Sequence, residues 1–226
     1  MEDQDWRQGL KLETIPVFET VSQLEFIKGL YLCGGTAQSL QLLHRKSEDL
    51  DFELIGTRKE RPQLDFSAIS NAVTDVYPDC RKEFLGRNQL QIFVNGNVKL
   101  SFSRPENAVP ELGKGFVYNN IVTPSLQELL GMKLFTIAVR SAFRDYYDIY
   151  ALLKAGYDLE QGVAYAGKFS RHTIHSKTIY GILLNDNYFR KPTDFSLLDP
   201  IYDVSTTDIA DFVKQYISEK HIKIKH

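Results

Sequence analysis

Hydrophobic and polar positions in the first half of the chain follow the periods of an α/β fold. Apolar residues at helical spacing predict helices over residues 17–28 and 64–77. Residues 30–35 have the pattern of a short buried strand that ends in a glycine turn, and residues 36–44 that of a helix. Acidic and apolar residues alternate over residues 49–55, which predicts a strand with one buried face.

Three further strands are predicted over residues 81–86, 89–96 and 97–105. The last two meet at an Asn-Gly-Asn turn, which is a strong hairpin signal. The predicted order is therefore helix-β-α-β-α-β-β-β, which is typical of a mixed α/β sheet.

Helical spacing replaces the strand pattern in the second half. Residues 123–141 form a predicted helix, with Ser125 and Glu128 at the spacing of a capping box. A second helix is predicted over residues 142–156, with Gly156 as its end. The remaining sequence also has mostly helical patterns, so the second half is predicted to be a helical domain.

Composition is ordinary for a globular protein, with 226 residues, 43% apolar residues and 25% charged residues. This length allows two domains, and we place them at residues 1–122 and 123–226. The net charge of −2 argues against a protein coated in basic charge for bulk nucleic-acid binding, although a local basic groove stays open.

Cysteine content and hydropathy favour a cytoplasmic protein. The two cysteines, Cys33 and Cys80, make neither a disulfide framework nor a zinc site, and Cys33 lies in an apolar run that predicts a core position. The acidic, polar start of the chain is unlike a signal peptide, and no apolar run approaches about 18 residues. We therefore expect no membrane span.

The turn formed by Gly34, Gly35 and Thr36 is a candidate phosphate-binding site. Glycines allow the backbone to approach a phosphate closely and to adopt positive φ. A helix N-terminus that follows such a turn offers N–H groups and a positive dipole end. An ordinary tight turn between strand and helix explains the same residues, with Thr36 as a plausible N-cap.

The acidic strand is a candidate metal site. Residues two apart on a strand face the same way, so Asp49, Asp51 and Glu53 share one face, with carboxylates roughly 7 Å apart. A divalent cation relieves their repulsion, and Mg²⁺ prefers oxygen ligands together with substrate phosphates. The alternative is a solvated strand face.

The two candidate sites together resemble a known family. The segment from Leu32 to Leu54 is similar to the GGTALxL…HRxSxDLDFF pattern of the AbiEii/AbiGii toxin family, within the polymerase-β-like nucleotidyltransferase superfamily. The matching residues are Gly34, Gly35, Thr36, Ala37, Leu40, His44, Arg45, Ser47, Asp49, Leu50, Asp51 and Phe52. This resemblance implies a polymerase-β-like core with a mixed sheet, followed by a helical half that completes the active-site cleft.

The resemblance extends to the helical half, where Lys133 matches the family's lysine and Arg144, Asp145 and Asp148 match its Arg-Asp-x-x-Asp element. It implies that Lys133 holds nucleotide phosphates and that Asp145 acts as a base or orienting carboxylate. Asp148 would support the helix or pair with Arg144, four residues away. A surface lysine and a local salt-bridge cluster are the alternatives.

Three further residues of the matching block lie between the turn and the acidic strand. Arg45 could hold a triphosphate bidentately or neutralise the two aspartates, and we favour the supporting role. His44 is predicted to be structural, and the Ser47 hydroxyl to fix the turn into the strand.

The implied activity is transfer of a nucleoside monophosphate from an NTP to an acceptor hydroxyl. Mg²⁺ or Mn²⁺ would bind Asp49 and Asp51, and the toxin resemblance suggests RNA, especially a tRNA 3′ end, as acceptor and a cognate antitoxin as partner. Basic stretches at residues 171–177, 189–192 and 220–226 could contact phosphates or be ordinary surface. A protein or small-molecule acceptor stays open.

One departure from the wider superfamily leaves a non-enzymatic alternative. Many members place a third carboxylate on a later strand, whereas the polar positions of that strand here are Ser101 and Ser103. There are three possible explanations. The first is that two carboxylates suffice, and the second is that Glu53 or Asp145 supplies the third charge. The third is that the chain binds nucleotide or a partner without turnover. The sequence leaves these three possibilities open, together with the base preference.

Overall fold

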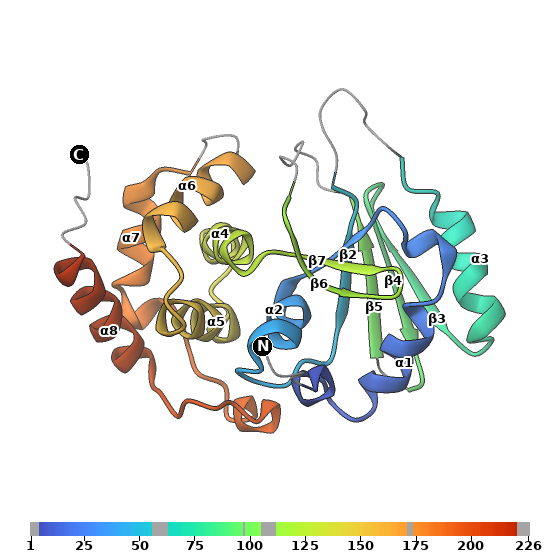
Figure 1. Ribbon diagram of the computed structural model, residues 1–226, viewed down its shortest axis with the longest axis horizontal. Helices are drawn as coiled ribbons and strands as arrows, with labels where there is room; N and C mark the ends of the chain where they lie inside the picture. Colours follow the sequence, from blue (N-terminus) through green and yellow to red (C-terminus); the bar gives the residue numbers. More distant parts are fainter. Residues whose placement is uncertain (1–4, 56–62, 97, 105–111, 171–173, 221–226) are drawn as a thin grey trace. The chain divides into compact units, whose positions relative to one another are not determined.

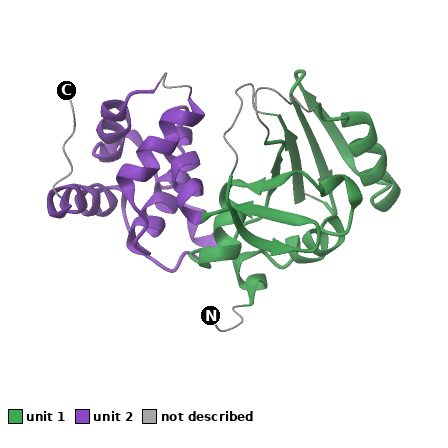
Figure 2. Cartoon of the chain, turned by 45° about the horizontal axis from the view of Figure 1, so that its top comes forward, with its two compact units in different colours: residues 1–125 green, residues 126–226 purple. Residues whose placement is uncertain are grey.

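The computed structural model describes residues 5–55, 63–96, 98–104, 112–170 and 174–220. The chain divides into two compact units, Met1–Ser125 and Leu126–His226, which Figure 2 colours separately. The first unit is built on a sheet and the second on helices (Figure 1).

The first unit is organised around a mixed seven-stranded sheet with the order β3-β4-β5-β2-β1-β7-β6. The strands are β1 (Tyr31–Cys33), β2 (Leu50–Glu53), β3 (Arg81–Leu85), β4 (Gln89–Val94), β5 (Val98–Ser103), β6 (Lys114–Tyr118) and β7 (Ile121–Pro124). Strand β1 pairs antiparallel with β2 and parallel with β7, and β2 pairs parallel with β5. The mixed sheet expected from the sequence is confirmed.

The core of this unit is built from the apolar faces of the central strands. The alternation in β2 buries Leu50 and Phe52, and the Phe52 ring stacks on Phe102 of β5 with centroids 5.4 Å apart. The predicted turn between β4 and β5 begins with two residues of positive φ, Asn95 at 46° and Gly96 at 88°. That geometry matches the twist of a two-stranded hairpin.

Helices α1 (Thr14–Val21), α2 (Gly34–Leu42) and α3 (Phe66–Val76) belong to the same unit, with short 3₁₀ turns at Trp6–Gly9 and Glu25–Ile27. The helix predicted over residues 17–28 is therefore wrong in its bounds. The chain leaves the helical conformation at Leu24, whose φ of −72° and ψ of 132° are extended. Ile27 still reaches the core through the 3₁₀ turn, which explains its place in the apolar pattern.

The hairpin of β6 and β7 was not predicted. Its turn contains Asn119 at a φ of 50°, and the Asn119-Asn120 pair was the available signal. The alternation in β6 is weak because this strand lies at the edge of the sheet and its pairing with β7 shifts register between Lys114 and Val117. The edge position leaves Val117 exposed, so hydropathy gave no clear pattern.

The second unit contains α4 (Leu126–Ile137), α5 (Phe143–Lys154), α6 (Leu159–Phe169), α7 (Ser176–Leu183) and α8 (Thr206–Glu219), with 3₁₀ turns at Asp186–Tyr188 and Phe195–Leu198. Helix α5 ends as predicted, because Gly156 adopts a φ of 91° just beyond it. Helices α4 and α6 approach closely: a Cβ on Gly162 would lie 2.8 Å from Leu130 Cγ.

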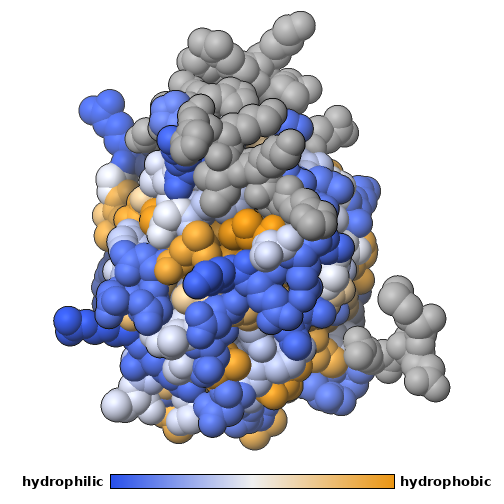
Figure 3. All heavy atoms as spheres, turned by 90° about the vertical axis from the view of Figure 1, so that its left-hand side faces the viewer, coloured by the Kyte–Doolittle hydropathy of each residue, from blue (hydrophilic) through white to orange (hydrophobic). Residues whose placement is uncertain are grey.

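The surface in Figure 3, on the side where α6, α7 and α8 lie in Figure 1, mixes hydrophilic residues with a short strip of hydrophobic ones. Within the part of the chain that the structure describes, no helix is both long enough and apolar enough to cross a membrane.

Candidate functional site

The glycine turn and the acidic strand lie side by side in the first unit. Antiparallel pairing of β1 with β2 sets Cys33 opposite Asp51, so the end of one strand meets the start of the other. Gly34 has a φ of 69°, and a Cβ at this position would lie 3.2 Å from Asp51 Oδ2. Glycine is therefore required here both by the backbone and by the neighbouring carboxylate.

Gly35 leaves room for a buried guanidinium. A Cβ at Gly35 would collide with Arg45 Nη2 and lie 3.5 Å from Ser47 Oγ. Arg45 is buried, and its Nη1 donates to the Lys46 carbonyl at 2.9 Å. Close packing against Arg45 therefore explains the glycine at residue 35 whether or not a phosphate binds at the turn.

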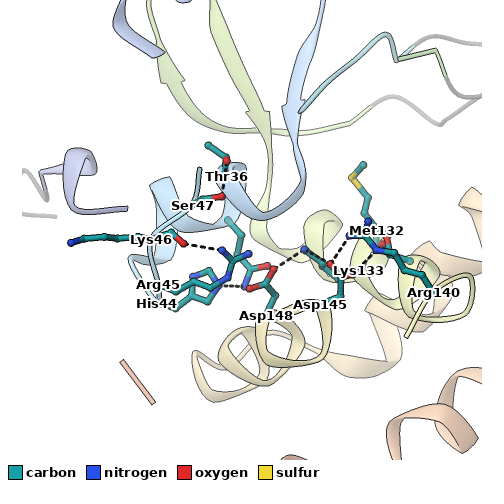
Figure 4. Close-up of polar contacts among 12 residues, drawn as sticks. Thr36, His44, Arg45, Lys46, Ser47, Met132, Lys133, Arg140, Asp145 and Asp148 are labelled. Atoms are coloured by element: carbon teal, nitrogen blue, oxygen red, sulfur yellow. Dashed lines mark hydrogen bonds and ion pairs between the residues drawn. The ribbon is translucent and has the colours of Figure 1, made fainter. Parts of the chain in front are cut away.

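Thr36 is not the helix N-cap that the sequence suggested. Helix α2 begins at Gly34 and its N-cap is Cys33, which makes no side-chain capping bond. The Thr36 hydroxyl instead lies 2.8 Å from Ser47 Oγ (Figure 4), and it donates to the Asp49 carbonyl oxygen. The hydroxyl pair therefore ties the turn to the acidic strand, in keeping with the role expected of Ser47.

The first N–H groups of α2 lack intrahelical acceptors, as at every helix N-terminus. They belong to Gly34, Gly35 and Thr36, and the Cys33 side chain supplies no acceptor. This end of the helix keeps the positive character that favours an anion.

Asp49 and Asp51 converge on a lysine that the sequence analysis missed. Lys99 Nζ, from β5, lies 2.8 Å from Asp49 Oδ2 and 3.9 Å from Asp51 Oδ1. The signal was present in the strand alternation, because Lys99 occupies the same face of its strand as Ser101 and Ser103. That alternation did not distinguish Lys99 from other lysines until the parallel pairing of β2 with β5 was known.

Ser101 occupies the position beside Asp51. The register of β2 and β5 pairs these two residues directly. Ser101 is buried, and its hydroxyl accepts a hydrogen bond from Gln89 Nε2 at 3.1 Å. A serine therefore stands on the strand where many members of the superfamily have a third acid.

Glu53, at the far end of β2, has a raised pKa. Burial of its carboxyl, with repulsion from Asp51, raises the pKa of Glu53 to about 7. The same two acids also act on Cys33: burial, then the charges of Glu53 and Asp51, raise the pKa of the thiol well above its usual range. Cys33 is a protonated core residue, as expected.

The pair Asp49 and Asp51 fits a cation. Both carboxylates reach the Lys99 ammonium, which shows that they can share one positive charge. Among the described residues, no group of three or more His, Cys, Asp or Glu side chains is arranged to hold a metal ion. Mg²⁺ commonly uses one or two carboxylates and completes its shell with water and substrate phosphates, so two suffice for that type of site.

A cavity of about 430 Å³ opens beside Asp49. Its lining is mostly polar and comes from α1, the segment before β2 and the β4–β5 turn. The lining residues are Glu13, Thr14, Glu48, Asp49, Asn95, Gly96 and Val98. The cavity therefore includes one of the two aspartates and none of the glycine-turn residues.

A buried ion cluster lies in the second unit. Lys133 Nζ, from α4, is 2.7 Å from Asp145 Oδ1 and 2.6 Å from Asp148 Oδ2, both on α5 (Figure 4). Both aspartates are fully buried, and Lys133 is 5% exposed. The three-residue spacing that the sequence analysis noted thus directs both carboxylates to one ammonium.

Arg140 completes this cluster and was not predicted. Its Nε donates to Asp145 Oδ2 at 2.8 Å, and its Nη2 donates to Asp145 Oδ1 at 3.2 Å. Burial alone would raise the pKa of Asp145, but Lys133 and Arg140 outweigh it and lower the pKa below its ordinary value. Arg144, the cation that the sequence pattern offered, is exposed.

His44 is fully buried, and its Nε2 lies 3.1 Å from Gln38 Nε2, which agrees with the structural role expected of it. Of the three basic stretches, residues 171–173 and 221–226 lie outside the described part of the chain. Arg190 and Lys191 are exposed.

Known proteins resemble this chain in sequence and in fold. The family model described as "Nucleotidyl transferase AbiEii toxin, Type IV TA system" matches residues 17–222. An uncharacterised protein of Aquifex aeolicus, aq_aa25, is 33% identical over 155 residues, which cover 67% of this chain and 71% of that protein.

Two solved structures from Helicobacter pylori share the fold. One is a candidate nucleotidyltransferase, with a TM-score of 0.57 and 19% identity over 96% of this chain and all of the other. The second is JHP933, with a TM-score of 0.54 and 16% identity over 94% of this chain and 96% of the other. At this identity the likeness concerns the fold, and it confirms the nucleotidyltransferase-like architecture that the resemblance implied.

Proposed function

The chain belongs to the AbiEii family of nucleotidyl transferase toxins, and from this premise we propose that it moves a nucleoside monophosphate from an NTP to an acceptor hydroxyl. The observation that carries the proposal is the contact between the glycine turn and Asp51. It brings a helix N-terminus, which favours phosphate, next to carboxylates that accept a cation.

We propose that Asp49 and Asp51 hold Mg²⁺ or Mn²⁺, which when bound would neutralise phosphate charge and polarise the α-phosphate toward attack. The N–H groups of Gly34, Gly35 and Thr36 would bind phosphate oxygens. Arg45 is buried against Gly35, so its charge would act on this end of α2 from a fixed position.

For the helical unit we propose the roles that the family resemblance implies. Lys133 would provide positive charge for nucleotide phosphates, and Asp145 would position that lysine or accept a proton. Support comes from the contact between Lys133 Nζ and both Asp145 and Asp148, since these two carboxylates fix where the ammonium lies. The same contacts suit a purely structural cluster, so stability and activity must be measured separately.

We propose RNA, and in particular the 3′ end of a tRNA, as the acceptor, and a cognate antitoxin as the partner. The description of the family as the toxin of a toxin–antitoxin system supports the partner, and the acceptor is the one that the sequence resemblance suggested. The exposed Arg190 and Lys191 offer charge for phosphate contacts. A protein or small-molecule acceptor is the alternative within the same chemistry.

The test is a transfer assay with each of the four α-³²P-labelled NTPs, Mg²⁺ or Mn²⁺, and total RNA, protein or small metabolites as acceptors. We expect label on RNA with the wild type and at least a hundredfold less with Asp49→Ala/Asp51→Ala, since lost charge neutralisation is costly. Nuclease and protease digestion would locate the label. Absence of transfer from every NTP to every acceptor would contradict the proposal.

A nucleotide-binding protein without turnover is the second candidate, and Ser101 beside Asp51 is the observation that favours it. This candidate predicts NTP binding by calorimetry that survives Asp51→Asn, with no product. Ser101→Asp adds the missing acid at the register position of Asp51. Activity that appears only in Ser101→Asp would support the second candidate over the first.

A further inference from the structure

The ammonium of Lys99 occupies the place between the two aspartates where a cation is needed. It is 2.8 Å from Asp49 and 3.9 Å from Asp51, whereas the side chains are only partly covered, at 22%, 24% and 40% exposure for Lys99, Asp49 and Asp51. The three groups come from two parallel strands, and they meet because β2 and β5 pair in register.

We propose that Lys99 is a resident counter-cation that holds the two carboxylates together and gives up this place when a divalent ion binds. This inference rests on the proposed function, because it assigns the control of that same metal site. Two nearby carboxylates without a cation repel each other, so the ammonium favours the arrangement that the ion later uses. Because it carries one charge to the ion's two, it is also a competitor that the ion can displace.

The lysine side chain suits such an exchange. It carries a compact charge on a flexible four-carbon stem, whereas an arginine fork would hold a carboxylate in a fixed bidentate geometry. At 22% exposure the Lys99 side chain is less confined than the Lys133 side chain, which is 6% exposed. Once displaced, the ammonium remains beside the metal site, where its charge favours a nucleotide phosphate.

A neighbouring ion pair provides the matched control. Lys11 Nζ lies 2.6 Å from Glu48 Oε2, and its side chain is 21% exposed, nearly the same as Lys99. Glu48 directly precedes Asp49, but it is not one of the two proposed ligands. Lys11→Gln therefore removes a similar charge from the same region and leaves Asp49 and Asp51 with their own lysine.

The experiment is a Mn²⁺ titration without nucleotide, followed by electron paramagnetic resonance of free Mn²⁺ and by calorimetry. Wild type, Lys99→Gln, Lys11→Gln and Asp49→Asn/Asp51→Asn are compared, each after circular dichroism confirms folding. We expect Lys99→Gln to bind Mn²⁺ roughly tenfold more tightly than wild type, because the competing charge is gone. Lys11→Gln should change the affinity less than about twofold, and the double aspartate variant should lose binding.

Thermal unfolding provides a second readout, which tests the proposal independently of the measured Mn²⁺ affinity. In EDTA, Lys99→Gln should melt below wild type because the carboxylates repel, and saturating Mn²⁺ should remove most of that difference. A variant that melts lower to the same extent with and without Mn²⁺ would overturn the proposal.

The outcomes separate this inference from the proposed function. Equal or weaker Mn²⁺ binding by Lys99→Gln, with binding still abolished by the aspartate substitutions, overturns the role of Lys99 and leaves the metal site intact. Equal tightening in Lys99→Gln and Lys11→Gln reduces the effect to general electrostatics and overturns the specific exchange. Absence of Mn²⁺ binding in every variant overturns the exchange, whereas the proposed function is then decided by the transfer assay, in which the nucleotide phosphates can complete the metal's shell.

Discussion

Gly34 stands so close to Asp51 that a methyl group on its α-carbon would lie 3.2 Å from the carboxylate oxygen. Its φ of 69° also lies in the region that L-residues disfavour. The turn and the acidic strand are therefore coupled, and a side chain at residue 34 requires the Asp51 carboxylate to shift by a few tenths of an ångström.

Gly34→Ala is expected to lower both stability and activity. The left-handed conformation costs an alanine about 1 kcal/mol, and displacement of Asp51 should reduce nucleotidyl transfer by roughly tenfold or more. Urea denaturation and the labelled-nucleotide assay measure the two effects.

Gly29→Ala is the control for that change, because Gly29 has a φ of 89° and a Cβ there meets no atom within 4 Å. It should cost similar stability and leave transfer unchanged. If the two variants lost activity equally, the contact with Asp51 would have no particular importance.

Lys133→Met is expected to destabilise the helical unit strongly. It leaves Asp145 and Asp148 buried with one fewer positive charge, and breaking a buried pair in this way costs about 3–5 kcal/mol. Arg140→Gln should cost less, because the Arg140 side chain is 52% exposed and Lys133 still neutralises Asp145. Chemical denaturation of both variants checks the order, and a Lys133→Met protein as stable as wild type would refute the account of the cluster.

Nucleotide binding by the same variants separates the two proposed roles of Lys133. If the lysine binds phosphates, Lys133→Met weakens NTP affinity in a protein that is still folded, at low temperature and without denaturant. If it is only structural, the folded fraction binds NTP as the wild type does. Arg140→Gln provides the comparison, since it perturbs Asp145 and keeps the lysine.

Asp145 should make the protein sensitive to acid. Its pKa is lower in the folded chain than in an unfolded one, so its contribution to stability is present at neutral pH. The contribution is lost as pH falls below about 4 and through the folded pKa. Asp145→Asn should therefore be less stable than wild type at pH 7, with a difference that shrinks toward pH 3.

Urea denaturation between pH 3 and pH 7 measures that difference, with Asp203→Asn as the control. Asp203 pairs with Lys191 at 3.0 Å but is fully exposed, so its loss should change stability little at any pH. A constant gap between wild type and Asp145→Asn across the whole range would disprove the linkage.

Glu53 should act in the opposite direction. Burial and then Asp51 raise its folded pKa to about 7, so between about pH 4.5 and 7 the folded chain binds the proton more tightly than the unfolded chain. Stability from this group is full below about pH 4.5 and decreases as pH rises to 7. In EDTA, Glu53→Gln should remove that slope and exceed wild type in stability at pH 8, by about 1–3 kcal/mol.

Glu25→Gln is a suitable control for that comparison, because the Glu25 side chain is 80% exposed. Parallel stability profiles for wild type and Glu53→Gln would show that the carboxyl of Glu53 titrates normally in the folded protein.

The sequence by itself determined the features that depend on near neighbours. The alternation of Leu50, Asp51 and Phe52 decided which face of β2 is buried, because successive side chains on a strand point to opposite sides. Gly96 and Gly156 marked a turn and a helix end through conformations that other residues disfavour. The block from Gly34 to Phe52 carried the family resemblance for the same reason, since its residues lie within one short helix–strand segment.

Only the tertiary structure decided which distant groups meet. Lys99 became the partner of Asp49 because β5 pairs parallel with β2, and nothing in the local pattern ranks it above other lysines. Arg144 is next to Asp145 in the sequence, but Arg140 is the arginine that donates to Asp145. Arg140 lies in the segment between α4 and α5, and the path of that segment brings its guanidinium to the Asp145 carboxylate. Ion pairing and strand register depend on the packing of segments far apart in the chain, whereas periodicity records only the exposure of each segment.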